Sequence, residues 1–517
     1  MRPEVAPALD AILKGQPVIP VPPAVWTDVA AFYGTRSGEP AWLDEQREPA
    51  IERATNALTL LHTKAAQGLG AIDYGEARII ELPPLIKMLD KRSRERGERL
   101  AELDVRLTTA MLAFGRDVAI GGAGPETVDL RWKSRRTPPD FVATLNTAVN
   151  GDLSSWVEAI RPPHPEYVAL QQALAGVEAQ QAKGGWTHVP APLQPGSSSA
   201  MVVALRQRLA ESGELKRNAA NASRTYDDDV VAGVRNFQML HGVNGTGVLD
   251  PTTLAAMNVP IEDRMAQIRV NLERWRWMPD DFGARHLMVN IPSFRLVASE
   301  GGRPVLDIRV IVGKPGNETP IFSDEMATVV FSPYWTIPET IVASETAPAA
   351  RRDRGYLARN NIEVLRMSRK QATTLDADEV DWDDPAKVRG LTFRQRPGAQ
   401  NALGLVKFLF PNPYGVYLHD TPADALFSRQ RRAFSHGCVR VELPEKLAHY
   451  VLRDDARWDI ARVNAAMRSG VEKHVRLKDR IPVHIVYFTA WVDGGLHLHP
   501  DVYGYDRRQF VAELKNR

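Results

Sequence analysis

The sequence predicts an α+β protein of several domains, with helices in its N-terminal half and a mainly β domain at its C-terminal end. At 517 residues, the chain is long enough for two or three domains that each have a core of their own. Apolar residues recur at helical spacing up to about residue 260. From Arg285 onward they alternate with polar residues, which is the spacing of strands.

The bulk composition excludes several classes of protein. Hydrophobic residues make up 44% of the chain, charged residues 25%, and the net charge is +2. Because surfaces that bind nucleic acid are usually strongly basic, we predict no nucleic-acid partner. No run of about 18 apolar residues occurs, so we predict no transmembrane helix. Prolines interrupt the longest uncharged stretch near the N-terminus, so we predict no signal peptide there; they are Pro17, Pro20, Pro22 and Pro23.

Residues 1–196 are predicted to form a helical domain. One helix face is marked by apolar residues at helical spacing, namely Leu100, Leu103, Leu107, Met111 and Phe114. A second helix is predicted from Ile51 to Gln67, and it stops at the helix-ending residue Gly68. The stretch from Val189 to Ala200 is rich in Pro, Gly and Ser, which predicts a linker at the end of this domain.

Residues 197–260 are predicted to form a compact unit of three short helices. Two helix faces are marked by apolar residues: Val202, Leu205 and Leu209, then Val230, Val234 and Phe237. Asp250 is predicted to cap the third helix, with Pro251 at its first position.

Residues 261–517 are predicted to form the mainly β domain. Strand-like alternation marks five stretches: 286–299, 305–313, 326–335, 416–420 and 481–492. Between them, residues 341–395 are polar and helix-prone, so we predict a helical insert within this domain.

The single cysteine of the chain, Cys438, lies in the segment RAFSHGCVRVE. One cysteine excludes an internal disulfide, which is compatible with the cytosol and also with an exported protein that avoids oxidation. Tyr417 and His419 are predicted on one face of a strand. His436, Cys438 and Arg440 share a face if their segment is extended. Two imidazoles, a thiol, a phenol and a guanidinium would then meet on one surface.

This group has the chemistry that a thiol nucleophile requires. A free thiol of pKa near 8.5 is only about 3% thiolate at pH 7, so an adjacent imidazole is needed to activate it. Backbone N–H groups around the turn at Gly437 and Cys438 would stabilise a tetrahedral oxyanion. Arg440 would hold a carboxylate through a two-pronged hydrogen bond.

Two other interpretations of the cysteine stay open at this point. A lone cysteine is usually a small buried hydrophobic residue. Alternatively, His419, His436 and Cys438 would bind zinc, although one thiolate with two imidazoles is an uncommon set of ligands. The spacing of these residues by itself does not choose between the alternatives.

The motif around Cys438 closely resembles the signature of the L,D-transpeptidases of bacterial cell-wall synthesis. The matching residues are His419 and, after fifteen intervening residues, Ser435-His436-Gly437-Cys438-Val439-Arg440. The stretch FRQRPGAQNALGLVKFLFPNPYGVYLHDTP resembles the large subclass, which carries an N-terminal scaffold and a peptidoglycan-binding module. LDVRLTTAMLAFGRDVAIG resembles the scaffold, and YDDDVVAGVRNFQMLHGVNGTGVLDPTTLAAMN resembles the module.

The resemblance implies roles for the residues of the motif. Cys438 would be the nucleophile and His419 its general base, oriented by a backbone carbonyl beside it. Supporting and substrate-binding roles are implied for the remaining positions, namely His436, Ser435, Gly437, Tyr417, Arg440 and Trp335. Trp335 has an alternative as a core tryptophan, and Arg440 has one as the ion-pair partner of Glu442 or another acid. The 341–395 insert would cap the cleft.

The implied reaction is the joining of peptidoglycan tetrapeptide stems, as donor and acceptor, into 3→3 cross-links through a cysteine thioester. No metal or organic cofactor is implied. Carbapenems are implied as covalent inhibitors and cell-wall synthesis proteins as partners, in the periplasm or cell envelope. The alternatives are an L,D-carboxypeptidase and a non-catalytic peptidoglycan-binding scaffold.

Two features depart from the family pattern. Many short members carry Ser or Gly after the base histidine, where this chain has Asp420. Because the orienting group there is a backbone carbonyl, we interpret this change as a difference between subclasses. The second departure is that we find no signal peptide in this sequence, although an envelope protein needs one.

Overall fold

The structure, a computed structural model, describes residues 5–132, 136–216, 222–368 and 371–515. It divides into two compact units, which we describe one at a time. The first unit combines Met1–Asp281 with Phe488–Arg517, and the second is Phe282–Tyr487. Helices dominate the first unit and strands the second, so the predicted α+β class is confirmed. Among the described residues, no helix combines the length and the apolar character needed to cross a membrane.

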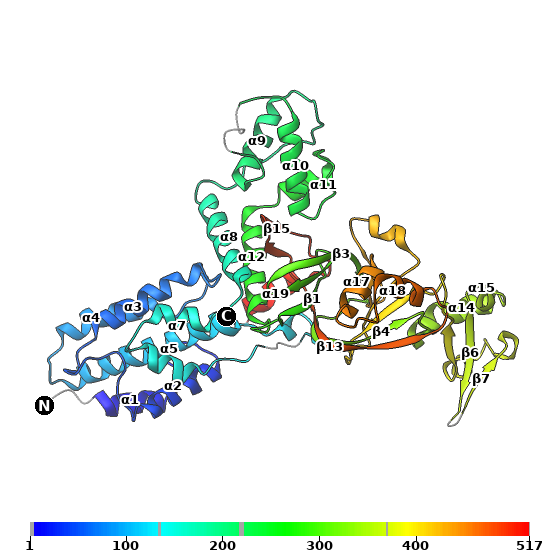
Figure 1. Cartoon of the computed structure of the whole chain (residues 1–517). Coiled ribbons are helices and arrows are strands. Elements are labelled where there is room, and N and C mark those ends of the chain that lie inside the picture. Colours follow the sequence, from blue (N-terminus) through cyan, green and yellow to red (C-terminus); the bar gives the residue numbers. More distant parts are fainter. Residues whose placement is uncertain (1–4, 133–135, 217–221, 369–370, 516–517) are drawn as a thin grey trace. The chain divides into compact units, whose positions relative to one another are not determined.

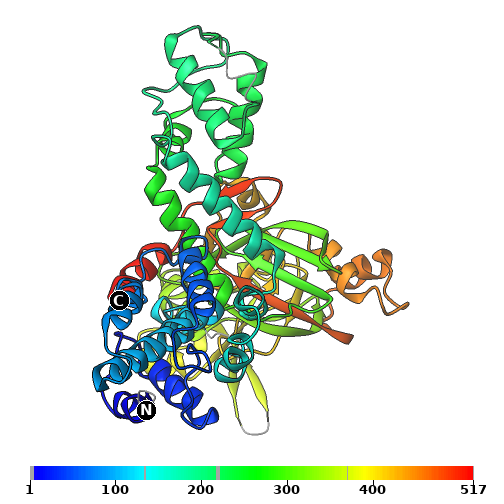
Figure 2. The same cartoon turned by 90° about the vertical axis from the view of Figure 1, so that its left-hand side faces the viewer.

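The N-terminal helices of the first unit pack around one long helix, α5 (Arg94–Ile120), as Figures 1 and 2 show. The helix face predicted from Leu100 to Phe114 lies within α5, and all five of its apolar residues are buried. The helix predicted from Ile51 is shorter, because a 3₁₀ turn replaces it after Leu61. The surrounding helices are α1 (Val5–Leu13), α2 (Pro23–Thr35), α3 (Ile51–Leu61), α4 (Glu76–Met88), α6 (Phe141–Ala148) and α7 (Leu153–Ile160).

The predicted three-helix module is present further along the first unit. Its helices are α9 (Ala200–Ser212), α10 (Asp228–Leu240) and α11 (Pro251–Met257), between α8 (Pro165–Gln181) and α12 (Ile261–Arg276). The six apolar residues that marked its helix faces are all buried in one core. The Asp250 side chain accepts a hydrogen bond from Thr253 N at 2.7 Å, and Pro251 opens α11, so the predicted cap is confirmed.

The C-terminal segment returns to the first unit as a hairpin and a helix. These elements are β14 (Ala490–Val492), β15 (Leu496–Leu498) and α19 (Tyr505–Lys515). Asp506 forms an ion pair of 2.7 Å with Arg274 of α12, whose side chain is fully buried. Residues 488–517 therefore belong to the same compact unit as the N-terminal helices, and the three predicted domain ranges remain a prediction.

The second unit is built on a nine-stranded sheet with the order β11-β3-β12-β10-β9-β4-β13-β1-β2. An additional pairing between β2 and β3 links the far edge back to the beginning, which closes most of the sheet into a ring. The strands are β1 (Arg285–Asn290), β2 (Arg295–Glu300), β3 (Arg303–Gly313), β4 (Phe322–Phe331), β9 (Val406–Leu409), β10 (Leu418–His419), β11 (Ala433–Ser435), β12 (Val439–Val441) and β13 (Lys473–Val486). Two helices accompany it, α17 (Pro444–Leu452) and α18 (Ile460–Met467).

The insert predicted as helical contains helices and, in addition, a small antiparallel sheet. Its order is β5-β8-β6-β7, with β5 (Trp335–Thr336), β6 (Ile362–Met367), β7 (Ala372–Leu375) and β8 (Thr392–Gln395). The helical parts are α13 (Glu339–Ile341), a π-helix (Val342–Thr346), α14 (Ala347–Arg352), α15 (Tyr356–Arg359) and α16 (Pro385–Arg389). Val364, Phe393 and Trp382 belong to a core of its own, which explains how a mostly polar sequence supports this substructure.

Candidate active site

Two short parallel strands bring the predicted site residues onto one face of the sheet. β10 pairs with β12 so that His419 lies opposite Arg440. The Val439 N–H extends this pairing by donating to the Tyr417 carbonyl at 3.2 Å. Side chains of paired residues point to the same face, and side chains two positions apart do so as well. Tyr417, His419, Cys438 and Arg440 therefore share one face, as the sequence predicted. His436, predicted on the same face, lies instead in the turn between β11 and β12.

The turn before Cys438 is held in an unusual backbone conformation. Gly437 has a φ of +116°, a region in which residues with a Cβ are strained. The buried hydroxyl of Ser435 fixes both sides of the turn, because it donates to the Cys438 carbonyl at 2.5 Å and accepts from Gly437 N at 3.1 Å. Ser435 and Gly437 thus position the thiol, and the sequence had assigned them to the oxyanion and substrate site.

Thr319 holds the same turn from the other side, and the sequence prediction missed it. Its side chain is fully buried. The hydroxyl donates to the Gly437 carbonyl at 2.8 Å and accepts from the Gly313 N–H at 2.8 Å. Because the C=O and N–H of a trans peptide point in opposite directions, this bond aims the Cys438 N–H away from Thr319. No sequence signal marks the residue, since its partner lies 118 positions further along.

His419 is buried and oriented by the main chain. Its Nδ1 lies 2.5 Å from the carbonyl oxygen of Asp420. A carbonyl only accepts hydrogen bonds, so Nδ1 carries the proton and Nε2 keeps its lone pair. Burial, together with the positive charges of Arg440 and Lys407, lowers the pKa of His419 to about 3. The imidazole is therefore neutral at pH 7, as a general base must be.

Cys438 is half-buried and contacts Tyr417. Burial raises the pKa of the thiol, while hydrogen bonds from the backbone and side chain of Tyr417 and the charge of Arg440 oppose that increase. The Tyr417 ring packs edge-on against His419, with 5.7 Å between the ring centroids. Burial, followed by the influence of Cys438, raises the pKa of the Tyr417 phenol, so the phenol stays protonated. Tyr417 thus contacts both the thiol and the imidazole.

Arg440 does not form the ion pair with Glu442 that the sequence allowed as an alternative role. Glu442, the predicted ion-pair partner, bonds Arg309 instead. Among the described residues no carboxylate forms an ion pair with Arg440, and its buried Nε has no hydrogen-bond partner. Burial lowers the pKa of Arg440, but a guanidinium stays charged at neutral pH. A partly buried cation of this kind is suited to an anionic group of a ligand.

The two remaining predicted residues lie toward the insert. His436 Nε2 is 3.1 Å from a carboxylate oxygen of Glu345, which belongs to the π-helix of the insert. Trp335 lies in β5 and packs against the core of the insert. His436 thus contacts the insert, and Trp335 lies in the small sheet. A role of Trp335 in the cleft stays a prediction.

Asp420, which departs from the family pattern, forms hydrogen bonds through both its main chain and its side chain. Its main-chain carbonyl orients His419, while its side chain accepts hydrogen bonds from Leu405 N at 2.7 Å and Thr421 N at 2.6 Å. Burial raises the pKa of Asp420 to about 6. A serine or glycine would supply the same carbonyl but would lack the carboxylate that holds residue 405 beside β10.

The described part of the chain gathers no group of three or more His, Cys, Asp or Glu residues in an arrangement that could hold a metal ion. His419, His436 and Cys438, considered above as zinc ligands, are not such a group in the structure. His419 uses Nδ1 on a main-chain carbonyl, and His436 pairs with Glu345.

Comparison with known protein families finds three matching domains along the chain. Residues 284–477 match the L,D-transpeptidase catalytic domain. Residues 27–174 match a scaffold domain, and residues 198–257 match a family described as "Putative peptidoglycan binding domain". The scaffold and binding matches lie in the first unit, and the catalytic match lies in the second unit.

A curated relative from Haemophilus influenzae is described as "Putative L,D-transpeptidase". It is 34% identical over 249 residues, which are 48% of this chain and 50% of the relative. The chain thus spans about half the length of the curated relative it matches.

Several solved structures share a low similarity with this chain. An L,D-transpeptidase from Xylanimonas cellulosilytica is 17% identical, with a TM-score of 0.17, over 57% of this chain and 98% of that one. One from Stackebrandtia nassauensis is 12% identical, with a TM-score of 0.22, over 57% and 97%. One from Mycobacterium smegmatis is 13% identical, with a TM-score of 0.20, over 39% and 58%.

Proposed function

We propose that this chain, whose residues 284–477 match the L,D-transpeptidase catalytic domain, forms 3→3 cross-links between peptidoglycan stems through a thioester on Cys438. The observation that carries the proposal is the shared sheet face of Cys438 and His419, whose imidazole is held with Nε2 as a free base. A nucleophile, a base and a group that orients the base are the parts that such acyl transfer requires.

In the first half of the reaction, His419 Nε2 takes the thiol proton while the sulfur attacks the carbonyl carbon of the third stem residue. The resulting oxyanion is stabilised by the Cys438 N–H, which the Thr319 bond positions from behind. When this intermediate collapses, the bond to the fourth residue breaks. The terminal D-amino acid leaves with the proton from His419, and a thioester remains on Cys438.

In the second half, a side-chain amine of an acceptor stem attacks the thioester carbonyl. His419 removes a proton from the amine and returns one to the departing sulfur, so the enzyme is regenerated. The reaction needs no oxidant and no external energy source, because one amide bond is exchanged for another. Arg440 is suited to bind a carboxylate of the donor stem, since its charge has no carboxylate partner in the described residues.

The experiment compares muropeptides from cells that express the wild-type chain or the Cys438→Ala variant. We expect new 3→3 dimers with the wild type alone. The intact-protein mass after incubation with a donor tetrapeptide should show the acyl group on the wild type and none on the variant. Dimers appearing equally with both proteins would refute the proposal.

The same digest separates the alternative functions. Stem tripeptides without dimers would indicate that water is the acceptor, which makes the protein an L,D-carboxypeptidase. No change in any stem would indicate a non-catalytic peptidoglycan-binding scaffold. A carbapenem should acylate the wild type and spare Cys438→Ala. Localisation in the periplasm or cell envelope, and contact with cell-wall synthesis proteins, belong to this proposal because the substrate is the wall.

A further inference from the structure

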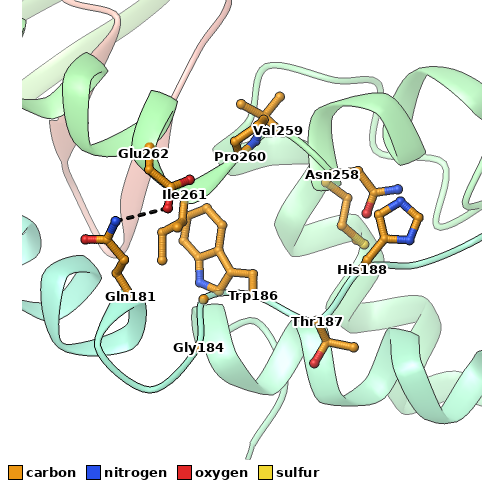
Figure 3. Close-up of a pocket in the computed structure, with 12 residues that line it drawn as sticks. Gln181, Gly184, Trp186, Thr187, His188, Asn258, Val259, Pro260, Ile261 and Glu262 are labelled. Atoms are coloured by element: carbon orange, nitrogen blue, oxygen red, sulfur yellow. Dashed lines mark hydrogen bonds between the residues drawn. The ribbon is translucent and has the colours of Figure 1, made fainter.

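A cavity of about 450 Å³ lies in the first unit, whereas the site described above belongs to the second unit (Figure 3). Its walls are residues of two chain segments, 181–188 and 257–262. Residues 189–197 separate the first segment from the domain matched over 198–257, and the second segment begins at the last residue of that domain, Met257. The volume is within the range of about 300–1,000 Å³ that small-ligand sites occupy.

The cavity walls are held in place by hydrogen bonds. Asn258 and the backbone of Val189 exchange two bonds, of 2.7 and 3.1 Å. The backbone N–H and the hydroxyl of Thr187 both donate to the carboxylate of Glu211, at 2.7 and 2.8 Å. A site with fixed walls loses little conformational entropy when a ligand binds, so this one is preorganised.

The indole of Trp186 forms an aromatic surface in the cavity. Figure 3 shows it between Gln181 and Glu262 at one end and His188 and Asn258 at the other. The Arg208 guanidinium lies 4.3 Å from the ring centroid and is not among the residues that line the cavity. The ring is half-buried, and the face toward the cavity remains for a ligand.

The charge of the lining restricts the class of ligand. Its twelve residues, all of them described, include no lysine or arginine and one carboxylate, Glu262. Gln181 donates to that carboxylate at 3.0 Å, and hydrogen bonds from the Glu262 backbone and from Gln181 lower the pKa of Glu262. The lining thus offers an anionic ligand, such as a stem peptide or a phosphate, no lysine or arginine as a partner. A wholly apolar ligand would cover the exposed carboxylate of Glu262 without replacing its contact with water.

We propose that this cavity binds a sugar residue of an uncharged glycan strand, with the sugar ring stacked on the Trp186 indole. A pyranose has an apolar face of C–H groups, which suits the indole, and an edge of hydroxyls, which suits amide, carboxylate and imidazole groups. In a peptidoglycan strand the charges are carried by the stems, so the backbone itself is neutral. The inference rests on the proposed function, which brings the chain to peptidoglycan.

The test measures binding by calorimetry to the full chain carrying Cys438→Ala, so that no thioester forms. The probes are chitotetraose, peptide-free glycan strands and an isolated stem tetrapeptide. We expect both glycans to bind, Trp186→Ala to weaken them about tenfold, and Trp186→Phe to retain most of the affinity. Stem binding should be the same in all three proteins.

Two further variants keep the test valid if Trp186→Ala folds poorly. Glu262→Ala changes an exposed side chain and should weaken both glycans several-fold. Trp26→Ala is the matched control, because it removes a half-buried indole of the scaffold region that lies outside the cavity, and it should leave glycan binding unchanged.

Several outcomes would overturn the inference. They are glycan affinities that do not change in Trp186→Ala and Glu262→Ala, no glycan binding at millimolar concentration, or a loss of stem binding in Trp186→Ala. Acylation of the chain with native Cys438 by a donor stem, measured in parallel, should not respond to Trp186→Ala. Absent acylation would reject the proposed function and leave the glycan result standing, so the two failures are distinguishable.

Discussion

At the scale of single residues, Thr319 offers the sharpest test of how the thiol turn works. Valine has the same shape as threonine but no hydroxyl, so Thr319→Val removes the hydrogen bond to the Gly437 carbonyl. In the proposed mechanism, the Cys438 N–H then loses its fixed direction toward the oxyanion. We expect acylation by a donor stem to slow about tenfold, with KM little changed, and Thr319→Ser to restore most of the rate. Time-resolved intact mass would measure this.

Alkylation by iodoacetamide provides the control for Thr319→Val. Alkylation requires the sulfur but forms no oxyanion, so its rate should not change in the variant. If acylation and alkylation slowed together, the thiol itself would have moved, and the assigned positioning role of Thr319 would be wrong.

The protonation states of Cys438 and His419 predict how the rate of alkylation of Cys438 depends on pH. Burial raises the pKa of the thiol and lowers that of His419 to about 3. A raised thiol pKa reduces the thiolate fraction at any given pH, and a lowered imidazole pKa removes imidazolium above about pH 3. The resting pair is therefore neutral at pH 7. We expect the alkylation rate to rise continuously from pH 6 to pH 10, without an acidic plateau.

Arg440 supplies the matched variant for the pH profile. Its charge lowers the pKa of the thiol, so Arg440→Met should shift the rise in alkylation to higher pH. A rate plateau between pH 4 and pH 7 in the wild type would mean that a thiolate–imidazolium pair already exists, contrary to this prediction.

At the scale of elements, the insert contacts the Cys438 segment through the pair of His436 and Glu345. Both side chains are partly exposed, at 34% and 54%, and such pairs contribute at most about 1 kcal/mol. We expect Glu345→Ala to raise KM for the donor stem by no more than about fivefold and to leave kcat almost unchanged. Steady-state kinetics with a soluble donor would measure the effect.

Glu339 is the matched control for this contact, because it is an exposed acid at the start of the insert with no ion pair among the described residues. Glu339→Ala should leave both constants unchanged. The contrary outcome is that Glu345→Ala changes neither KM nor kcat in the wild type or in a His436→Ala background. That result would show that the contact contributes no free energy to donor binding, and that the insert does not act through this pair.

At the scale of the whole molecule, the C-terminal return stabilises the first unit. Arg274 is fully buried and pairs with Asp506. Removing one partner of a buried pair leaves an uncompensated charge, which costs about 3 kcal/mol or more. We expect Asp506→Ala to lower the free energy of unfolding of the first unit by about 3 kcal/mol, measured by chemical denaturation.

The second unit provides the internal reference for Asp506→Ala, because Asp506 lies in the first unit. Acylation of Cys438 by a donor stem, measured below the unfolding transition, should stay at the wild-type rate. An unfolding curve identical to that of the wild type would show that the Arg274–Asp506 pair is not important for the stability of the first unit.

Much of the fold could be predicted because its signals are local. The face from Leu100 to Phe114 repeats every three or four residues, and the Asp250 cap uses residues within one helical turn. The insert was predicted as helical because its polar sequence hides the short strands β6, β7 and β8. Those strands are stabilised by pairing with one another, which the β-propensities of their own residues do not reveal.

Sequence alone determined the α+β class, the helix faces, the Asp250 cap, and the set of a thiol, two imidazoles, a phenol and a guanidinium within some twenty residues. Tertiary structure alone decided which groups meet: Thr319 with Gly437, Glu345 with His436, and Glu442 with Arg309 instead of Arg440. The cavity beside Trp186 and the pairing of Arg274 with Asp506 belong to the same category. Periodicity and capping depend on neighbours along the chain, whereas these contacts join segments far apart in sequence, so only the packed fold specifies them.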